Sequence, residues 1–214
     1  MYSLREGKIE DLPRVLELIK ELALYEKAPE QVTNTLDMME KDGFGPNPVY
    51  GLYVCEKNNT GEIIGIAIYY YRYSTWKGKR LYLEDIVVTE SERGNGAGKM
   101  LFDRVMAKCL EDGCTGMMWQ VLDWNEPAIN FYKKYGASLE AGWLNAHLQD
   151  YEIRELLKDI PGVDIIVDRP ADGPPAGAPI NIEVSGDDYE QLLATAEDIK
   201  QFIKTNNIFS SVCN

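Results

Sequence analysis

A glycine-rich turn after an apolar run is the stretch of this sequence best suited to binding chemistry. The run ends at Val87 and Val88, and Arg93-Gly94-Asn95-Gly96-Ala97-Gly98 follows at the start of an amphipathic segment. Glycines let the backbone approach a ligand closely, and the exposed N–H groups of a helix N-terminus favour anions. Arg93 can add a charge-assisted contact. The turn therefore predicts a pyrophosphate site made mostly of main chain.

Two better-known phosphate motifs do not match this spacing. A dinucleotide-binding fingerprint needs G-x-G-x-x-G near the first strand and an acid about 20 residues further on. A P-loop needs Ser or Thr after its Lys, but Met100 follows Lys99 here. A glycine-rich helix start without any ligand stays open as an alternative on the turn alone.

Two carboxylates, Glu84 and Asp85, stand at consecutive positions of a largely apolar strand. Alternation along a strand predicts that they point to opposite faces, so that only one of them faces a reaction centre. A Cys–His nucleophile pair has little support, because His147 is the single histidine. The four cysteines show neither CxxC nor metal-ligand spacing, so no metal site is expected.

Hydrophobic periodicity predicts the elements that position these groups. Apolar spacing of three to four indicates helices, and alternation with turn residues between the runs indicates strands. The expected strands are 1–8, 50–56, 63–73, 81–88, 118–122 and 141–148, and the expected helices are 11–25, 35–42, 96–112 and 126–135. This order predicts an α/β fold with a mixed sheet and helices on its faces.

The composition changes after residue 158. The segment 170–179 holds four prolines and two glycines, which is typical of a linker. A strand over 180–184 and a helix over 188–205 are predicted beyond it. We therefore expect a domain at 1–158, a linker at 159–179 and a strand–helix appendage at 180–214.

Charge and hydropathy narrow the classes of partner. The formal net charge of −13 argues against nucleic acid, because phosphate binding needs a basic face, and it favours cationic ligands. No run of 18 or more apolar residues is present, so we expect no membrane span. Cysteines that lie in apolar segments behave as small hydrophobes, and we expect a cytoplasmic protein.

Collinear motifs over residues 2–150 resemble the GNAT acetyltransferase superfamily, and within it the diamine (spermidine/spermine) and thialysine N-acetyltransferases. The resemblance implies the GNAT fold, acetyl-CoA as cosubstrate and a homodimer. The motifs that carry it are Arg93 to Gly98, Ile19 to Ala23 with Tyr25-Glu26, Asp42 to Gly45, Tyr73 to Gly78, Leu81 to Asp85, Val121 to Pro127, Asn130 to Ala137 and Gly142-Trp143.

The resemblance also implies roles for single residues. Tyr132 is the proton donor to the departing thiolate, and Glu84 binds the cationic amine or accepts its proton through water. A phenol, with a pKa of about 10, keeps its proton at neutral pH. The cofactor contacts are Ile86, Val87, Val88, Arg93, Gly94, Asn95, Gly96, Ala97, Gly98, Lys99 and Asn125. The amine contacts are Tyr25, Glu26, Glu84 and Trp143.

The implied reaction is direct attack of a small cationic amine on acetyl-CoA in a ternary complex, without an acetyl-enzyme. Ala141 stands where the polyamine enzymes usually have an acid, so a lysine analogue or a short diamine is as plausible as a long polyamine. A catalytically idle acetyl-CoA-binding or assembly protein and a protein-lysine acetyltransferase remain as alternatives.

The tail carries a second resemblance. The segment 168–208, and especially Ala171 to Pro175 with Ala178 to Val184, resembles part of the porter region of RND efflux pumps. Transport does not follow, because a pump needs many membrane helices. The preferred interpretation is a fusion of coding fragments, with a regulatory or dimer-stabilising module as the second.

Overall fold

The computed structural model describes residues 1–142, 144–157 and 189–205. They belong to two compact units, and the first contains residues 1–136. Of the predicted site residues, Trp143 lies outside the described residues, and all the others belong to the first unit. The predicted linker at 159–179 and strand at 180–184 also lie outside them.

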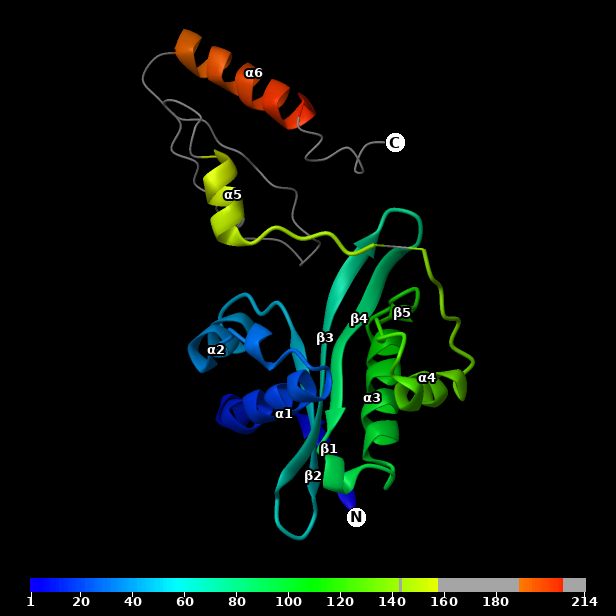
Figure 1. The fold of residues 1–214 in the computed structure, drawn as a ribbon. Coiled ribbons are helices and arrows are strands. Elements are labelled where there is room, and N and C mark those ends of the chain that lie inside the picture. Colours follow the sequence, from blue (N-terminus) through cyan, green and yellow to red (C-terminus); the bar gives the residue numbers. More distant parts are fainter. Residues whose placement is uncertain (143, 158–188, 206–214) are drawn as a thin grey trace. The chain divides into compact units, whose positions relative to one another are not determined.

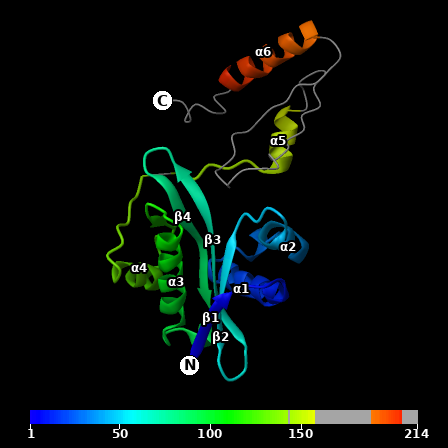
Figure 2. The same cartoon turned by 180° about the vertical axis from the view of Figure 1, so that it is seen from behind.

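The first unit is built on a five-stranded sheet in the order β1-β2-β3-β4-β5 (Figures 1 and 2). The first four strands pair antiparallel, and β5 joins β4 in parallel. The strands are β1 (Tyr2–Glu6), β2 (Gly51–Lys57), β3 (Ile63–Ser74), β4 (Gly78–Val88) and β5 (Met117–Met118). The prediction of an α/β fold with a mixed sheet is confirmed.

Helices cover both faces of this sheet (Figure 1). On one face lie α1 (Leu12–Tyr25) and α2 (Leu36–Phe44), and on the other α3 (Ala97–Glu111) and α4 (Glu126–Lys133). The apolar stripe of α1, with Leu12, Val15 and Leu18, packs into one core with inward-facing residues of β2, β3 and β4. Since β3 is covered on both sides, its residues 63–69 are all buried, and its sequence is a continuous apolar run.

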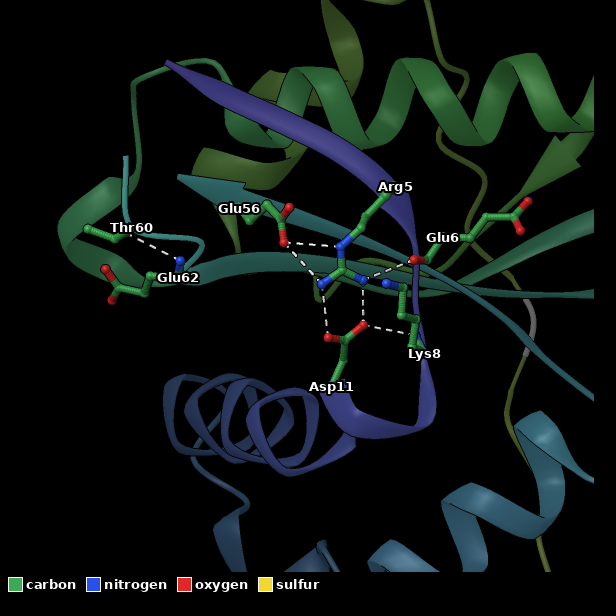
Figure 3. A network of polar contacts seen from close by, with 7 residues as sticks. All are labelled: Arg5, Glu6, Lys8, Asp11, Glu56, Thr60 and Glu62. Atoms are coloured by element: carbon green, nitrogen blue, oxygen red, sulfur yellow. Dashed lines mark hydrogen bonds and ion pairs between the residues drawn. The ribbon is translucent and has the colours of Figure 1, made fainter. Parts of the chain in front are cut away.

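An ion pair fixes the corner between β1 and α1 (Figure 3). The Arg5 guanidinium donates to both oxygens of Asp11, at 2.6 and 2.9 Å, and the Lys8 amide donates to the same carboxylate at 2.8 Å. Asp11 is the N-cap of α1 by position, but its side chain makes no cap hydrogen bond to that helix. Asp11 therefore anchors Arg5, which also pairs with Glu56.

The register between β3 and β4 changes at the two predicted carboxylates, Glu84 and Asp85. Ile68 pairs with Asp85 and Tyr69 with Leu83, so Glu84 is an extra residue without a partner on β3. Such a bulge interrupts the strict alternation of side chains between the two faces. The prediction that Glu84 and Asp85 point to opposite faces assumed an unbroken strand, and this assumption is wrong.

The end of the predicted domain differs from expectation. The strand expected at 118–122 is limited to Met117–Met118, and the described residues of 141–148 form no strand. Alternation alone does not make a strand when no neighbouring strand supplies the hydrogen bonds. In the second unit, α5 (Asp150–Leu157) was not predicted, whereas α6 (Tyr189–Thr205) matches the predicted tail helix. None of the described helices is long and apolar enough to cross a membrane.

Candidate active site

The glycine-rich turn has the geometry that an anion site requires. Gly94 and Gly96 adopt φ angles of 79° and 92°, which favour glycine over other residues. A Cβ atom at either position would meet nothing within 4 Å, so the space beside the turn is open. Gly96 is the N-cap of α3 and has no side chain to cap the first amides of the helix. These amides are left to favour a negatively charged ligand.

Arg93 lies across this turn and contacts the end of α1. Its Nε donates to the carbonyl oxygen of Val88 at 2.9 Å, and its guanidinium carbon lies 5.1 Å from the centre of the Tyr25 ring. The other two guanidinium nitrogens remain as donors for an anion. Lys99, in the first turn of α3, forms an ion pair with Asp103 one turn further along.

Tyr25 also connects to α4. Its hydroxyl donates to Oδ1 of Asn125 at 3.1 Å, and the same oxygen accepts from the Ala128 amide at 3.3 Å as the N-cap of α4. Trp124 adds ring contacts to Tyr25 at 5.8 Å and to the Lys27 ammonium at 5.4 Å. Tyr25 therefore contacts Arg93 and Asn125, two residues that the sequence analysis assigned to the cofactor, although Tyr25 itself was assigned to the amine.

Tyr132 is buried on the inner side of α4, with 5% of its surface exposed. Its ring packs against Trp119 at 4.9 Å and Phe102 at 5.5 Å between centroids. Burial, and to a lesser extent the charge of Asp85, raise the pKa of Tyr132 to about 12. The phenol therefore holds its proton throughout the physiological range and can act as an acid towards a stronger base.

The charge of Asp85 acts on Tyr132, and the charges of two further carboxylates, Glu84 and Glu26, act on Asp85. Burial, together with repulsion from Glu84 and Glu26, raises the pKa of Asp85 to about 6. Desolvation also raises the pKa of Glu84 and of Glu26, although both side chains keep contact with solvent. Among the described residues, none of the three carboxylates has an ion-pair partner. An unpaired cluster of this kind favours a cationic ligand.

Asp85 is the site residue that sequence reasoning set aside. The sequence analysis used strand alternation to decide which carboxylate faces the reaction centre. The bulge at Glu84 interrupts this alternation, so the decision no longer holds. Tyr70 and Tyr82 were also missed; their rings lie 5.0 Å apart, and the charge of Glu84 contributes to raising the pKa of both. The aromatic run in β3 was a signal for Tyr70, whereas Tyr82 lies in β4, outside that run.

The remaining predicted residues lie along β4 and the helix start that follows it. Ile86 and Val88 are partly buried and Val87 is in the core, on the part of β4 that continues beyond its two residue pairs with β5. The backbone of β4 at this edge has no strand partner among the described residues, so it can pair with a ligand. No described group of three or more His, Cys, Asp or Glu residues could hold a metal ion.

A hollow of about 360 Å³ lies elsewhere, beside α2 between Asp37 and Pro46. None of the residues predicted to bind a ligand lines it. The candidate site is therefore identified by the carboxylates and the glycine-rich turn, and not by this hollow.

With this geometry in view, the relatives of the chain are informative. Residues 12–137 match the acetyltransferase (GNAT) family. The chain belongs to this family. It is an acetyltransferase, as its motifs predicted, and like the rest of its family it uses acetyl-CoA as cosubstrate.

Two curated relatives lie in the branch that the motifs suggested. The thialysine N-epsilon-acetyltransferase of Bos taurus is 40% identical over 162 residues, which cover 72% of this chain and 95% of that protein. The spermidine/spermine N(1)-acetyltransferase-like protein 1 of Homo sapiens is 36% identical over 164 residues, which cover 73% of this chain and 23% of that protein.

Solved structures share the fold at lower identity. Glucosamine-6-phosphate N-acetyltransferase from Arabidopsis thaliana superposes with a TM-score of 0.56 at 20% identity, over 70% of this chain and 99% of that one. An aminoglycoside acetyltransferase from an uncultured soil sample gives a TM-score of 0.59 at 18% identity, over 69% of this chain and 97% of that one.

Proposed function

We propose that this acetyltransferase transfers acetyl from acetyl-CoA to a primary amine of a small cationic substrate, either a thialysine-like amino acid or a diamine. The observation that carries the proposal is the group of unpaired carboxylates Glu26, Glu84 and Asp85: the charges of Glu84 and Glu26 act on Asp85, and the charge of Asp85 acts on the buried Tyr132. Carboxylates attract an ammonium group, and a nearby acid can protonate a departing thiolate. The names of the curated relatives support the same class of amine.

Acetyl-CoA, when bound, supplies the acetyl group as an activated thioester. The turn Gly94 to Gly98, with its open space and uncapped helix start, fits its pyrophosphate, and Arg93 adds charge. Asn125 and the free edge of β4 at Ile86, Val87 and Val88 provide polar groups for the arm between pyrophosphate and sulfur.

The residues of the carboxylate cluster move the amine's proton. An ammonium must lose a proton before its nitrogen can attack, and Glu84 with Asp85 accepts it, through water where needed. The nitrogen attacks directly in a ternary complex, and the bond between acetyl and sulfur breaks. Tyr132 then gives its phenolic proton to the sulfur, the nitrogen releases its second proton to solvent, and Tyr132 regains a proton from solvent. Glu26, directly after α1, completes the amine side, to which the resemblance adds Trp143.

A CoA-release assay tests the proposal with thialysine, ornithine, lysine, putrescine, spermidine and a lysine-containing peptide as acceptors. We expect turnover with at least one small amine, and a loss of about 100-fold or more in kcat for Tyr132→Phe. Tyr135→Phe is the matched control, because its hydroxyl bonds Asp103 and not a site residue. Turnover with the peptide alone would favour a protein-lysine acetyltransferase. Binding of acetyl-CoA without turnover on any acceptor would favour the idle protein.

We also propose a cytoplasmic homodimer, supported by the resemblance and by cysteines in apolar segments. The proposed division remains a domain at 1–158, a linker at 159–179 and an appendage at 180–214. Comparing the solution mass of the full chain with that of a chain ending at residue 164 tests both proposals. A monomer in both cases would contradict the dimer.

A further inference from the structure

Tyr25 connects the two faces of the sheet. It is the last residue of α1, whereas Asn125 begins α4 on the other face (Figures 1 and 2). Side chains from opposite faces can meet only where the sheet is open. The sheet is open beyond Leu81 and Tyr82, the two residues of β4 that pair with β5. The Tyr25–Asn125 bond therefore spans the opening at which the two substrates must meet.

The bond from Tyr25 decides how Asn125 faces this opening. Oδ1 of Asn125 accepts from both the Tyr25 hydroxyl and the Ala128 amide, at 3.1 and 3.3 Å. A carbonyl oxygen has two lone pairs, so both are used. Turning the amide over would place its NH2 group against the Ala128 N–H and lose the cap. The side chain is held with Nδ2, which can only donate, as its remaining polar end.

The ring of Tyr25 also orients Arg93. The Arg93 guanidinium lies 5.1 Å from the ring centre, and its Nε is already bonded to the Val88 carbonyl. A guanidinium tied at Nε and packed on an aromatic face keeps few rotamers, so less entropy is lost when its other nitrogens bind a ligand. The hydroxyl and the ring of one residue thus orient two donors.

The end of α1 is itself held in place. The turn after Tyr25 requires a φ angle of 63° at Lys27, which is uncommon for a residue other than glycine. The Ala28 amide donates to the Ala23 carbonyl at 2.9 Å, and the Lys27 ammonium lies over Trp124. The turn and the loop before α4 therefore contact each other at two points, through Lys27 and through Tyr25.

We propose that Tyr25 is a positioning residue for acetyl-CoA: it orients Asn125 through its hydroxyl and Arg93 through its ring. This inference rests on the proposed function only for the identity of the ligand. It makes a prediction that an amine contact would not make. Loss of the hydroxyl should weaken the binding of CoA in the absence of any amine.

Calorimetric titration of the full chain with CoA tests the inference. We expect Tyr25→Phe, which keeps the ring, to weaken CoA binding about 3- to 10-fold, the usual effect of one lost neutral hydrogen bond. Tyr25→Leu should weaken it further. Tyr50→Phe is the matched control, because its hydroxyl donates to the Met39 carbonyl at 2.7 Å on the α2 side. It should leave CoA affinity unchanged.

A second variant separates positioning from folding. Asn125→Asp keeps an acceptor for both Tyr25 and Ala128 but loses the Nδ2 donor. We expect it to weaken CoA binding with little change in melting temperature. Combining it with Tyr25→Phe should cost less than the sum of the single changes, because both act through one group.

Steady-state kinetics complete the test. For Tyr25→Phe we expect a higher KM for acetyl-CoA and a KM for the amine within about twofold of wild type. A raised amine KM with unchanged CoA affinity would overturn the inference, and so would no change in either. If no amine is acetylated but Tyr25→Phe still weakens CoA binding, the proposed function fails and the inference stands.

Discussion

Asp11, which is buried, and Asp85, which is partly buried, are two aspartates in opposite surroundings. Asp11, at the corner between β1 and α1, accepts two hydrogen bonds from Arg5, and this guanidinium holds the pKa of Asp11 below its usual range. Asp85 lies beside Glu84 and Glu26 and has no cation among the described residues, so its pKa rises to about 6. The comparison separates a carboxylate that stabilises the fold from one that costs stability and is available to a ligand.

The largest effect is expected for a substitution of Asp85. We expect Asp85→Asn to lower kcat/KM for the amine about 100-fold, because a charge that attracts and deprotonates the ammonium is lost. Asp37→Asn, on the exposed side of α2, is the control and should keep full activity. Steady-state kinetics with the best amine measure both. An Asp85→Asn enzyme with wild-type kinetics would remove Asp85 from the site.

The second prediction concerns the effect of a substitution of Asp11 on stability. Removing one partner of a buried pair leaves the other charge uncompensated, so Asp11→Asn should lower the free energy of unfolding by about 2 to 3 kcal/mol. The value is below that of a fully buried pair because Arg5 keeps Glu56 as a partner. Urea unfolding measures it, and kcat at a permissive temperature should stay near wild type. A loss of activity without a loss of stability would contradict this assignment.

The third prediction concerns pH. Asp85 binds its proton more tightly folded than unfolded, so its contribution is favourable below about pH 4 and is lost as the pH rises to about 6. Asp11 has the opposite sign: its contribution is present above its unfolded pKa and is lost as the pH falls through its lower folded pKa. Asp85→Asn should therefore stabilise the protein by about 1 to 2 kcal/mol at pH 8 and by little at pH 4.

Urea unfolding between about pH 3 and pH 8 distinguishes the two signs. The difference between Asp85→Asn and wild type should grow between about pH 4 and pH 6, whereas the difference for Asp11→Asn should stay constant above about pH 4 and shrink below it. The activity profile should follow the same group: an additional rising limb near pH 6 in kcat/KM that Asp85→Asn removes. A stability difference for Asp85→Asn that is constant with pH would sink the electrostatic explanation.

The smallest effect is expected for the melting temperature when an amine ligand is added. A diamine or thialysine at ten times its Kd should raise the melting temperature at pH 8 by about 2 to 4 °C, since a ligand that binds only the folded state stabilises it. Asp85→Asn should lose most of this shift, and Asp11→Asn should keep it. An equal shift in all three proteins would place the amine away from Asp85.

Local chemistry explains which parts of the fold could be predicted. The start of α3 follows from Gly94 and Gly96, whose backbone angles do not depend on distant residues. The stripe of α1 and the continuous apolar run of β3 likewise follow from spacing and composition. The strand predicted at 141–148 failed because a strand needs hydrogen bonds from a neighbouring strand, which alternation does not reveal.

By itself the sequence determined the class of fold, the family and the turn that suits a pyrophosphate, because each rests on short-range patterns and collinear motifs. Only the tertiary structure decided which carboxylate joins Tyr132 and what Tyr25 contacts. The bulge at Glu84 comes from the register between β3 and β4, and the Tyr25–Asn125 bond joins residues 100 positions apart. Register and long-range contact depend on how whole strands and helices pack, so the local pattern around these residues could not fix them.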